Sequence, residues 1–205
     1  MLQRVLVWDV PTRVFHWTLA LSFAGAYLTA ESERYRDIHV ALGYLMLGMI
    51  GFRLVWGFAG TAYARFGSFL YKPSAVVGYV RSLFSPQPEH HVGHNPAGGV
   101  AIFLLLALGL LLGTSGVLLY WELGDEDLFE ELHEISANLM LAVVVVHVAG
   151  VLVSSVLHKE NLVRAMFTGY KQAANAVSIP RAYAWLGVVM ALLSVAFLII
   201  YLGIL

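Results

Sequence analysis

The chain contains no cysteine, and charged residues make up only 12% of its 205 positions. Without cysteine it can form no disulfide, thiolate metal site or iron–sulfur cluster, and it lacks the C-x-x-C-H motif that attaches c-type haem. Any bound metal is therefore expected to be held by histidine. We expect no nucleic-acid partner.

Apolar residues fill most of the sequence, at 60% of the total, which is the composition of a membrane protein. A helix needs about 20 apolar residues to cross the hydrocarbon of a bilayer. Windows of that kind lie at about 14–30, 38–59, 97–120, 133–157 and 182–204. These segments leave no room for a soluble domain, so we predict an all-α integral membrane protein whose single domain spans residues 1–205. A cleaved signal peptide is a disfavoured alternative for the first window, which is too long and contains His16.

The charged residues predict the orientation of the helices. Basic residues gather at one set of segment ends: Arg4, Arg13, Arg53, Arg65, Lys72, Arg81, Lys159, Arg164, Lys171 and Arg181. Acidic residues gather at the other set: Glu31, Glu33, Asp37, Glu122, Asp125, Glu126, Asp127, Glu130, Glu131 and Glu134. Because cytoplasmic loops carry the excess of Lys and Arg, we place the amino terminus in the cytoplasm and the carboxyl terminus outside. The loop 60–96 is then cytoplasmic, and Pro73 begins a short interfacial helix in it.

Four histidines lie in the apolar segments, where ionisable side chains are costly and indicate a functional site. His133 and His147 are fourteen residues apart, so they project from one helix face within about 40° of each other and about 21 Å apart along the axis. The predicted topology places His16 at the depth of His147 and His39 at the depth of His133. We therefore predict two histidine pairs near opposite membrane faces.

The residues around each pair favour haem over a bare metal ion. Imidazole alone does not distinguish haem from zinc, copper or non-haem iron. The only carboxylate near either pair is Glu134, which points about 100° away from His133. Two imidazoles suit the axial positions of a porphyrin. Glycines on the facing helices could make room for the macrocycle: Gly43, Gly48, Gly51, Gly109, Gly113 and Gly116. Hydrogen bonding between helices is the alternative explanation for each histidine.

Several motifs resemble those of the bacterial cytochrome b561 group, which includes the b-type cytochrome subunit of nickel–iron hydrogenases. They are VWDVPTRVFHW at residues 7–17, RLVWGFAG at 53–60 with ARF at 64–66, GHNP at 93–96, and the fourteen-residue histidine pair. The resemblance implies a four-helix transmembrane bundle that binds two haem b groups through His16, His39, His133 and His147. The fifth, C-terminal transmembrane helix goes beyond this bundle, and we expect it at the bundle edge or against a partner.

Filled axial positions favour electron transfer over oxygen chemistry at iron. The resemblance implies transfer in the bacterial inner membrane, among its lipids, between quinone and a periplasmic redox protein such as a c-type cytochrome or a hydrogenase-like subunit. Residues for a quinone headgroup gather on the cytoplasmic side: Trp8, Asp9, Arg13, Trp17, Arg53 and His158. Arg53 could instead pair with a haem propionate. An ordinary interfacial belt is the alternative for the whole group.

Other functions remain open at this point. A self-contained superoxide:quinone oxidoreductase needs the same haems and quinone site, so the sequence does not decide between a stand-alone enzyme and an electron-transfer subunit. A non-haem proton-relay or metal-transport bundle would also use intramembrane histidines. His90, His91 and His94 are interpreted as solvated loop residues, because no shell of carboxylates completes a metal site there.

Overall fold

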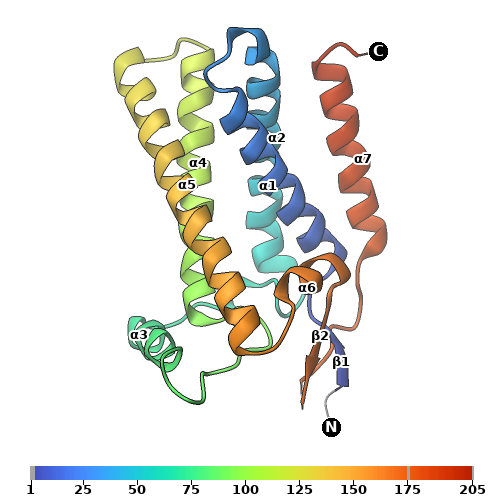
Figure 1. The fold of residues 1–205 in the computed structure, drawn as a ribbon. Helices are drawn as coiled ribbons and strands as arrows, with labels where there is room; N and C mark the ends of the chain where they lie inside the picture. Colours follow the sequence, from blue (N-terminus) through green and yellow to red (C-terminus); the bar gives the residue numbers. More distant parts are fainter. Residues whose placement is uncertain (1–2, 175, 205) are drawn as a thin grey trace.

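Five long helices run along one axis in the computed structural model, which describes residues 3–174 and 176–204 (Figure 1). They are α1 (Val10–Thr29), α2 (Arg36–Ala59), α4 (Pro96–Tyr120), α5 (Glu126–Leu157) and α7 (Ala184–Tyr201). Shorter elements are α3 (Pro73–Ser82), α6 (Leu162–Thr168), strands β1 (Gln3–Leu6) and β2 (Tyr170–Ala173), and 3₁₀ turns at Glu33–Tyr35 and Phe66–Ser68. Each of the five apolar windows thus forms a helix, and the short helix predicted from Pro73 is present.

The chain is a multi-pass membrane protein. Four helical segments are long and apolar enough to cross a bilayer: Glu33–Ala59, Pro96–Tyr120, Glu126–Leu157 and Ala184–Tyr201. The 20-residue α1 is not among them, although its length of about 30 Å matches the hydrocarbon thickness. The chain termini lie at opposite ends of the bundle (Figure 1). The end that carries β1, β2, α3 and α6 is called here the N-terminal end.

A small antiparallel sheet departs from the all-α prediction. Strands β1 and β2 pair from Gln3 with Ala173 to Leu6 with Tyr170. Val5 and Val7 are buried in a small apolar cluster with Ala165 of α6. The sheet therefore fastens the start of the chain to the segment that follows α5. Four-residue strands give too short a period-2 pattern to be recognised in the sequence.

Polar side chains just before the helices fix where these begin. Asp9, Asn95, Asp125 and Asn161 each accept a hydrogen bond from the backbone N–H three residues ahead, at the starts of α1, α4, α5 and α6. Such caps satisfy backbone donors that have no partner within the helix. The cap at Asp125 explains why α5 begins at Glu126, well before the apolar window that starts at 133.

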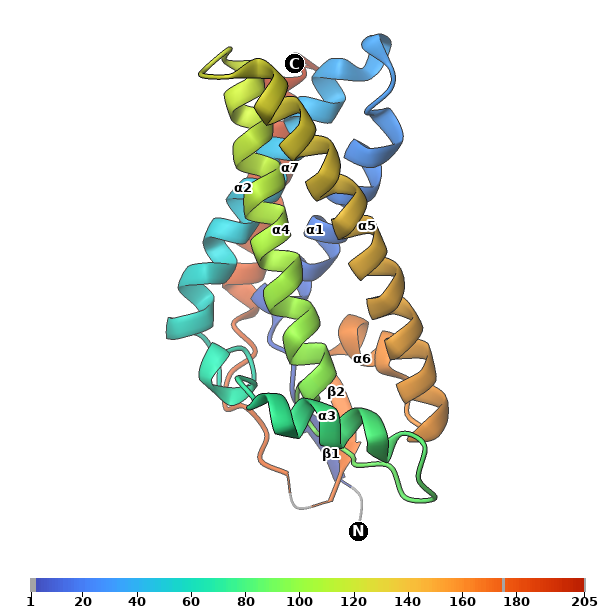
Figure 2. The ribbon, with the colours of Figure 1, turned by 90° about the vertical axis from the view of Figure 1, so that its left-hand side faces the viewer.

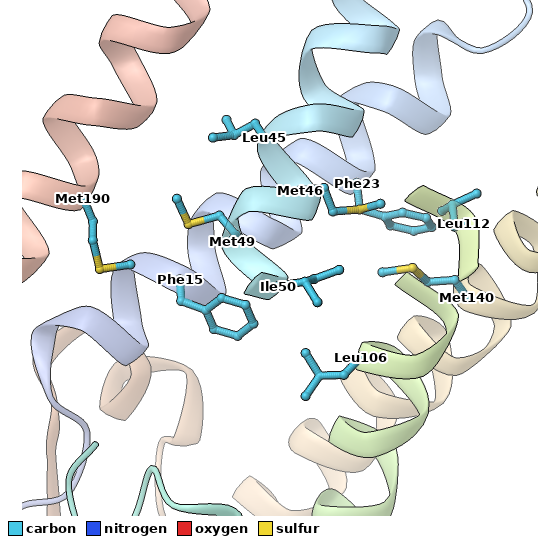
Figure 3. Close-up of a cluster of buried hydrophobic side chains, with 10 residues drawn as sticks. All are labelled: Phe15, Phe23, Leu45, Met46, Met49, Ile50, Leu106, Leu112, Met140 and Met190. Atoms are coloured by element: carbon cyan, nitrogen blue, oxygen red, sulfur yellow. The ribbon is translucent and has the colours of Figure 1, made fainter. Parts of the chain in front are cut away.

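The helices pack as two pairs, α1 along α2 and α4 along α5, with α2 also touching α4. Gly109 and Gly113 allow this approach, since a Cβ at either position would overlap Ile50 or Leu47 of α2. A buried cluster from five helices fills the middle of the bundle (Figure 3): Phe15, Phe23, Leu45, Met46, Met49, Ile50, Leu106, Leu112, Met140 and Met190. Helix α7 packs at the edge, against α1 and α2, as expected.

Candidate functional site

His39 and His133 lie together near the end of the bundle opposite the N-terminal end. His39 is in the first turns of α2 and His133 is near the start of α5. Their ring centroids are 6.1 Å apart and the ring planes are inclined by 63°. The structure thus brings together two side chains that are far apart in the sequence, as the predicted topology required.

The hydrogen bonds of these two rings define which nitrogen is free. Nδ1 of His39 is 2.9 Å from the Ala26 carbonyl oxygen, and Nδ1 of His133 is 3.0 Å from that of Leu112. A carbonyl can only accept, so both Nδ1 atoms carry the proton and donate it. Each Nε2 then has its lone pair available. Imidazoles that bind a metal are usually oriented by such a bond from the other nitrogen.

The spacing of the two rings also fits one metal ion between them. Metal–imidazole bonds of about 2 Å and the half-widths of two rings place the centroids roughly 6 Å apart when the imidazoles bind one ion from opposite sides. The observed 6.1 Å agrees with that value. Gly116 leaves room for the His133 ring, because a Cβ at position 116 would lie only 2.8 Å from Cε1 of His133. This pair therefore fits the two axial positions of a haem.

His16 and His147 form the second level, towards the N-terminal end. His16 lies on α1 and His147 on α5, close enough to interact electrostatically. The two helices do not pack along each other, and Figure 2 shows α5 diverging from α4 towards this end. Nδ1 of His16 is buried without a hydrogen-bond partner. His133 and His147 both lie on α5, and a separation of fourteen residues corresponds to about 21 Å along a helix axis.

Arg53 lies at the same end and is only 2% exposed. Its Nη2 donates to the Ala64 carbonyl at 2.9 Å, and its guanidinium carbon lies 4.7 Å from the centre of the Phe66 ring. Its Nη1 is buried and has no hydrogen-bond partner. A buried guanidinium normally pairs with an anion, and it fits a carboxylate especially well. Arg53 therefore suits a haem propionate, and its burial excludes simple snorkelling to the interface.

Asp9 is fully buried at the start of α1. One carboxylate oxygen accepts from the Thr12 backbone N–H at 2.7 Å. The other accepts from Nε1 of Trp56 at 3.1 Å and from the Thr61 hydroxyl at 2.6 Å. Both oxygens are thus engaged with the protein, and the side chain joins α1 to the end of α2.

Arg13 and Trp17, two of the residues predicted near a quinone, both reach the last turn of α6. Trp17 stacks on Phe167 with centroids 4.3 Å apart, and its Nε1 donates to the Met166 carbonyl at 3.3 Å. Arg13 donates from Nη1 to the Phe167 carbonyl. The Phe167 side chain is 59% exposed, so one apolar aromatic face stays accessible beside Trp17. Helix α6 was not predicted from the sequence, although Asn161 marks its start.

The side chains of Trp8 and His158, two further members of that group, contact other histidines. Trp8 contacts the His94 ring, with centroids 4.6 Å apart. His158 follows the end of α5 and contacts His90, with centroids 5.1 Å apart. The structure therefore divides the predicted group into several neighbourhoods at the N-terminal end.

The interpretation of all three loop histidines as solvated is wrong for His94. Its ring lies between Trp8 and Phe69, with centroid distances of 4.6 and 4.4 Å. Burial, and then the nearby positive charge of Arg53, lower the pKa of His94 to about 3. The GHNP motif was the available signal, because Asn95 caps α4 and so fixes the residue before it. His90, by contrast, is partly exposed and lies 3.3 Å from Glu160.

The loop histidines do not form a metal site of their own. No group of three or more His, Asp or Glu side chains that could hold a metal ion occurs in residues 3–174 and 176–204. His91 and His94 instead line part of a cavity of about 470 Å³, together with Tyr63, Tyr71 and Ile179. The candidate ligands thus remain the two histidine pairs, each of which needs a cofactor that brings its own further ligands.

Comparison with known proteins agrees with this geometry. A family model described as prokaryotic cytochrome b561 matches residues 7–169. A probable Ni/Fe-hydrogenase B-type cytochrome subunit of Rhizobium leguminosarum bv. viciae is 27% identical and is aligned over 82% of this chain and 88% of its own. Its counterpart in Azotobacter vinelandii is 24% identical, with the same coverage of 82% and 88%. No solved structure matches the chain significantly.

The matched range contains Asp9, Arg53 and the four histidines of the two pairs. The structure also has four helical segments that are long and apolar enough to cross a membrane. Membership in a cytochrome b family implies a b-type haem and electron transport. The chain belongs to the prokaryotic cytochrome b561 family.

Proposed function

We propose that this protein is a dihaem cytochrome b that carries electrons across the bacterial inner membrane between the quinone pool and a periplasmic redox partner. His39 and His133 would hold the haem on the periplasmic side, and His16 and His147 the haem on the cytoplasmic side. The arrangement of His39 and His133 carries the proposal, since their spacing and their Nδ1 hydrogen bonds suit axial ligation. A b-type haem held by two imidazoles would supply one-electron transfer.

The protein's part in this function is to hold and insulate the two sites. Met140, a member of the buried apolar cluster (Figure 3), lies between His133 and His147 on α5, so this cluster would help to insulate the two sites. Helix α1 is placed as a fifth membrane span because it runs beside α2 and carries His16. The basic N-terminal end is assigned to the cytoplasm and the acidic α4–α5 loop to the periplasm.

The names of the relatives support a choice of partner. Their names describe subunits of Ni/Fe hydrogenases, so we propose a hydrogenase as the periplasmic partner in preference to a soluble c-type cytochrome. Glu126 and Asp127 lie exposed in the first turn of α5 at the end assigned to the periplasm. Acidic groups there would speed association with a basic surface.

The quinone is placed at the face formed by Trp17 and Phe167. This face lies at the depth of His16, and it offers an exposed aromatic ring together with the Arg13 guanidinium. An aromatic face beside a hydrogen-bond donor suits a flat ring with carbonyl oxygens. Asp9 supports this face by fixing the start of α1, and Trp8 lies against His94.

The test measures how fast a reduced quinol analogue reduces the haems of the purified, lipid-reconstituted protein. Replacing Trp17 by leucine is expected to slow this reduction about tenfold, equal to roughly 1.4 kcal/mol of lost aromatic contact, without changing haem content. Trp185→Leu is the matched control, because Trp185 is an exposed tryptophan at the same end of the bundle. Equal rates in the two variants would exclude this face. Rapid haem reduction by superoxide with the chain alone would instead indicate a stand-alone oxidoreductase.

A further inference from the structure

His94 belongs to a loop, but its backbone is hydrogen-bonded and its ring packs against aromatic side chains. The Tyr71 hydroxyl donates to its backbone carbonyl at 3.0 Å, and Asn95 next to it caps α4. The imidazole lies between Trp8 and Phe69. Its Nδ1 is buried and has no hydrogen-bond partner. A buried ring nitrogen without a partner costs free energy, and in the tautomer that carries the proton on Nδ1 this nitrogen can donate to a ligand.

Arg53 also has a buried nitrogen without a hydrogen-bond partner, and its guanidinium lies near the Phe69 ring. Its guanidinium carbon is 5.8 Å from the centre of the Phe69 ring, whose centroid is 4.4 Å from that of His94. Nη1 of Arg53 is buried without a partner, like Nδ1 of His94. Two buried nitrogens without partners, one of them on a permanently charged group, therefore lie near the Phe69 ring, and His94 is close enough to Arg53, His16 and His147 to interact with them electrostatically.

The acidic side chains nearby do not neutralise this charge. Asp9 interacts with Arg53 electrostatically, but its oxygens accept from Thr12, Trp56 and Thr61. Glu160 lies 3.0 Å from Nζ of Lys171 and is paired with it. Among residues 3–174 and 176–204, no carboxylate lies within salt-bridge distance of Arg53. The missing anion must then come with a ligand.

A carboxylate of the cofactor supplies that anion, whereas a neutral quinone would leave the Arg53 charge uncompensated. We propose that Arg53 and His94 together bind one propionate of the haem held by His16 and His147, with His94 donating a hydrogen bond from Nδ1. This rests on the proposed function, since it needs a haem at that level. It adds a binding residue outside the four membrane-embedded ligands.

The bond has a defined effect on the haem. A propionate carries negative charge near the iron and thereby favours the oxidised state. A donor such as His94 draws part of that charge away and favours the reduced state, because hydrogen bonds and local charge set the reduction potential of a haem. Loss of the donor therefore lowers the potential of this haem and leaves the distant haem unchanged.

The experiment is a spectroelectrochemical titration of both haems in the full-length protein, with resonance Raman spectra of the propionate bending modes. His94→Phe keeps an aromatic ring between Trp8 and Phe69 but removes the donor, and His94→Leu is a second donor-free variant. We expect the reduction equilibrium of the cytoplasmic-side haem to fall about tenfold, or about 59 mV for one electron, with a shifted propionate band. His94→Gln, which keeps an N–H donor, should restore most of the potential and the band.

His90→Ala is the matched control, because His90 belongs to the same loop but lies beside Glu160. Unchanged potentials and propionate bands in both donor-free variants, with both haems retained, would overturn the role of His94 and leave the dihaem proposal intact. Purified unmodified protein without haem would overturn both. The haem concerned is identified as the one that is lost in His147→Ala.

Discussion

Replacing His133 by alanine is expected to remove one of the two proposed haems and to leave the other with its spectrum unchanged. His133 and His39 form a pair whose ring centroids are 6.1 Å apart, whereas His147 lies about four turns further along α5. With one imidazole gone, a single side chain would remain to hold the haem of that site, which would then be weakly bound. Haem content per chain should therefore fall from about two to about one.

The combination of variants makes this prediction specific. His39→Ala should cause the same loss as His133→Ala, and the double variant should be no worse than either, because both act on one site. His147→Ala should remove the other haem. His158→Ala is the control, since His158 follows the same helix but contacts His90. The pairing is wrong if His133→Ala and His147→Ala remove the same haem, which optical redox titration would reveal.

Replacing Asp9 by alanine is expected to destabilise the fold rather than to act on the quinone alone. The change removes the cap of α1 and leaves the Trp56 and Thr61 donors without their buried acceptor. A lost cap costs about 1 kcal/mol and each hydrogen bond to a buried charge about 1.5–3 kcal/mol. We expect the free energy of unfolding, measured by denaturation in detergent, to fall by about 4 kcal/mol.

Two further variants separate the contributions at this position. Asp9→Asn can keep the cap through its carbonyl oxygen, but its amide nitrogen can accept from neither Trp56 nor Thr61. The Thr61 hydroxyl can rotate to accept from that nitrogen, whereas the Trp56 N–H stays unpaired, so this variant should lose roughly half as much stability. Thr61→Val removes only one donor, and its loss should be smaller still. Wild-type stability of Asp9→Ala combined with a loss of quinol oxidation would show that Asp9 binds quinone directly.

Hydropathy predicted the long helices well because a lipid-exposed backbone must satisfy its own hydrogen bonds, which leaves a helix as the solution for a single span. The residues at which helices begin are set by polar caps, which hydropathy does not detect. The apolar window at 133–157 missed the first turns of α5, where the acidic residues after Asp125 continue the helix. The juxtaposition of His39 and His133 could be predicted because charge bias and helical spacing constrain it independently.

Contacts made at the N-terminal end could not be predicted in the same way. Asp9 meets Trp56 and Thr61 only after α1 and α2 have packed, and no local pattern records that contact. The burial of His94 depends on Trp8 and Phe69, which come from two other segments. Short elements such as β1, β2 and α6 carry too few residues for a periodic signal.

The most direct test of the whole account is the haem content and spin state of the purified, unmodified protein. Pyridine haemochrome analysis should give about two b-type haems per chain, and low-temperature electron paramagnetic resonance should show both ferric irons in the low-spin state of two-imidazole ligation. Absence of haem, or one high-spin five-coordinate haem per chain, would contradict the assignment of His16, His39, His133 and His147 as two pairs of axial ligands.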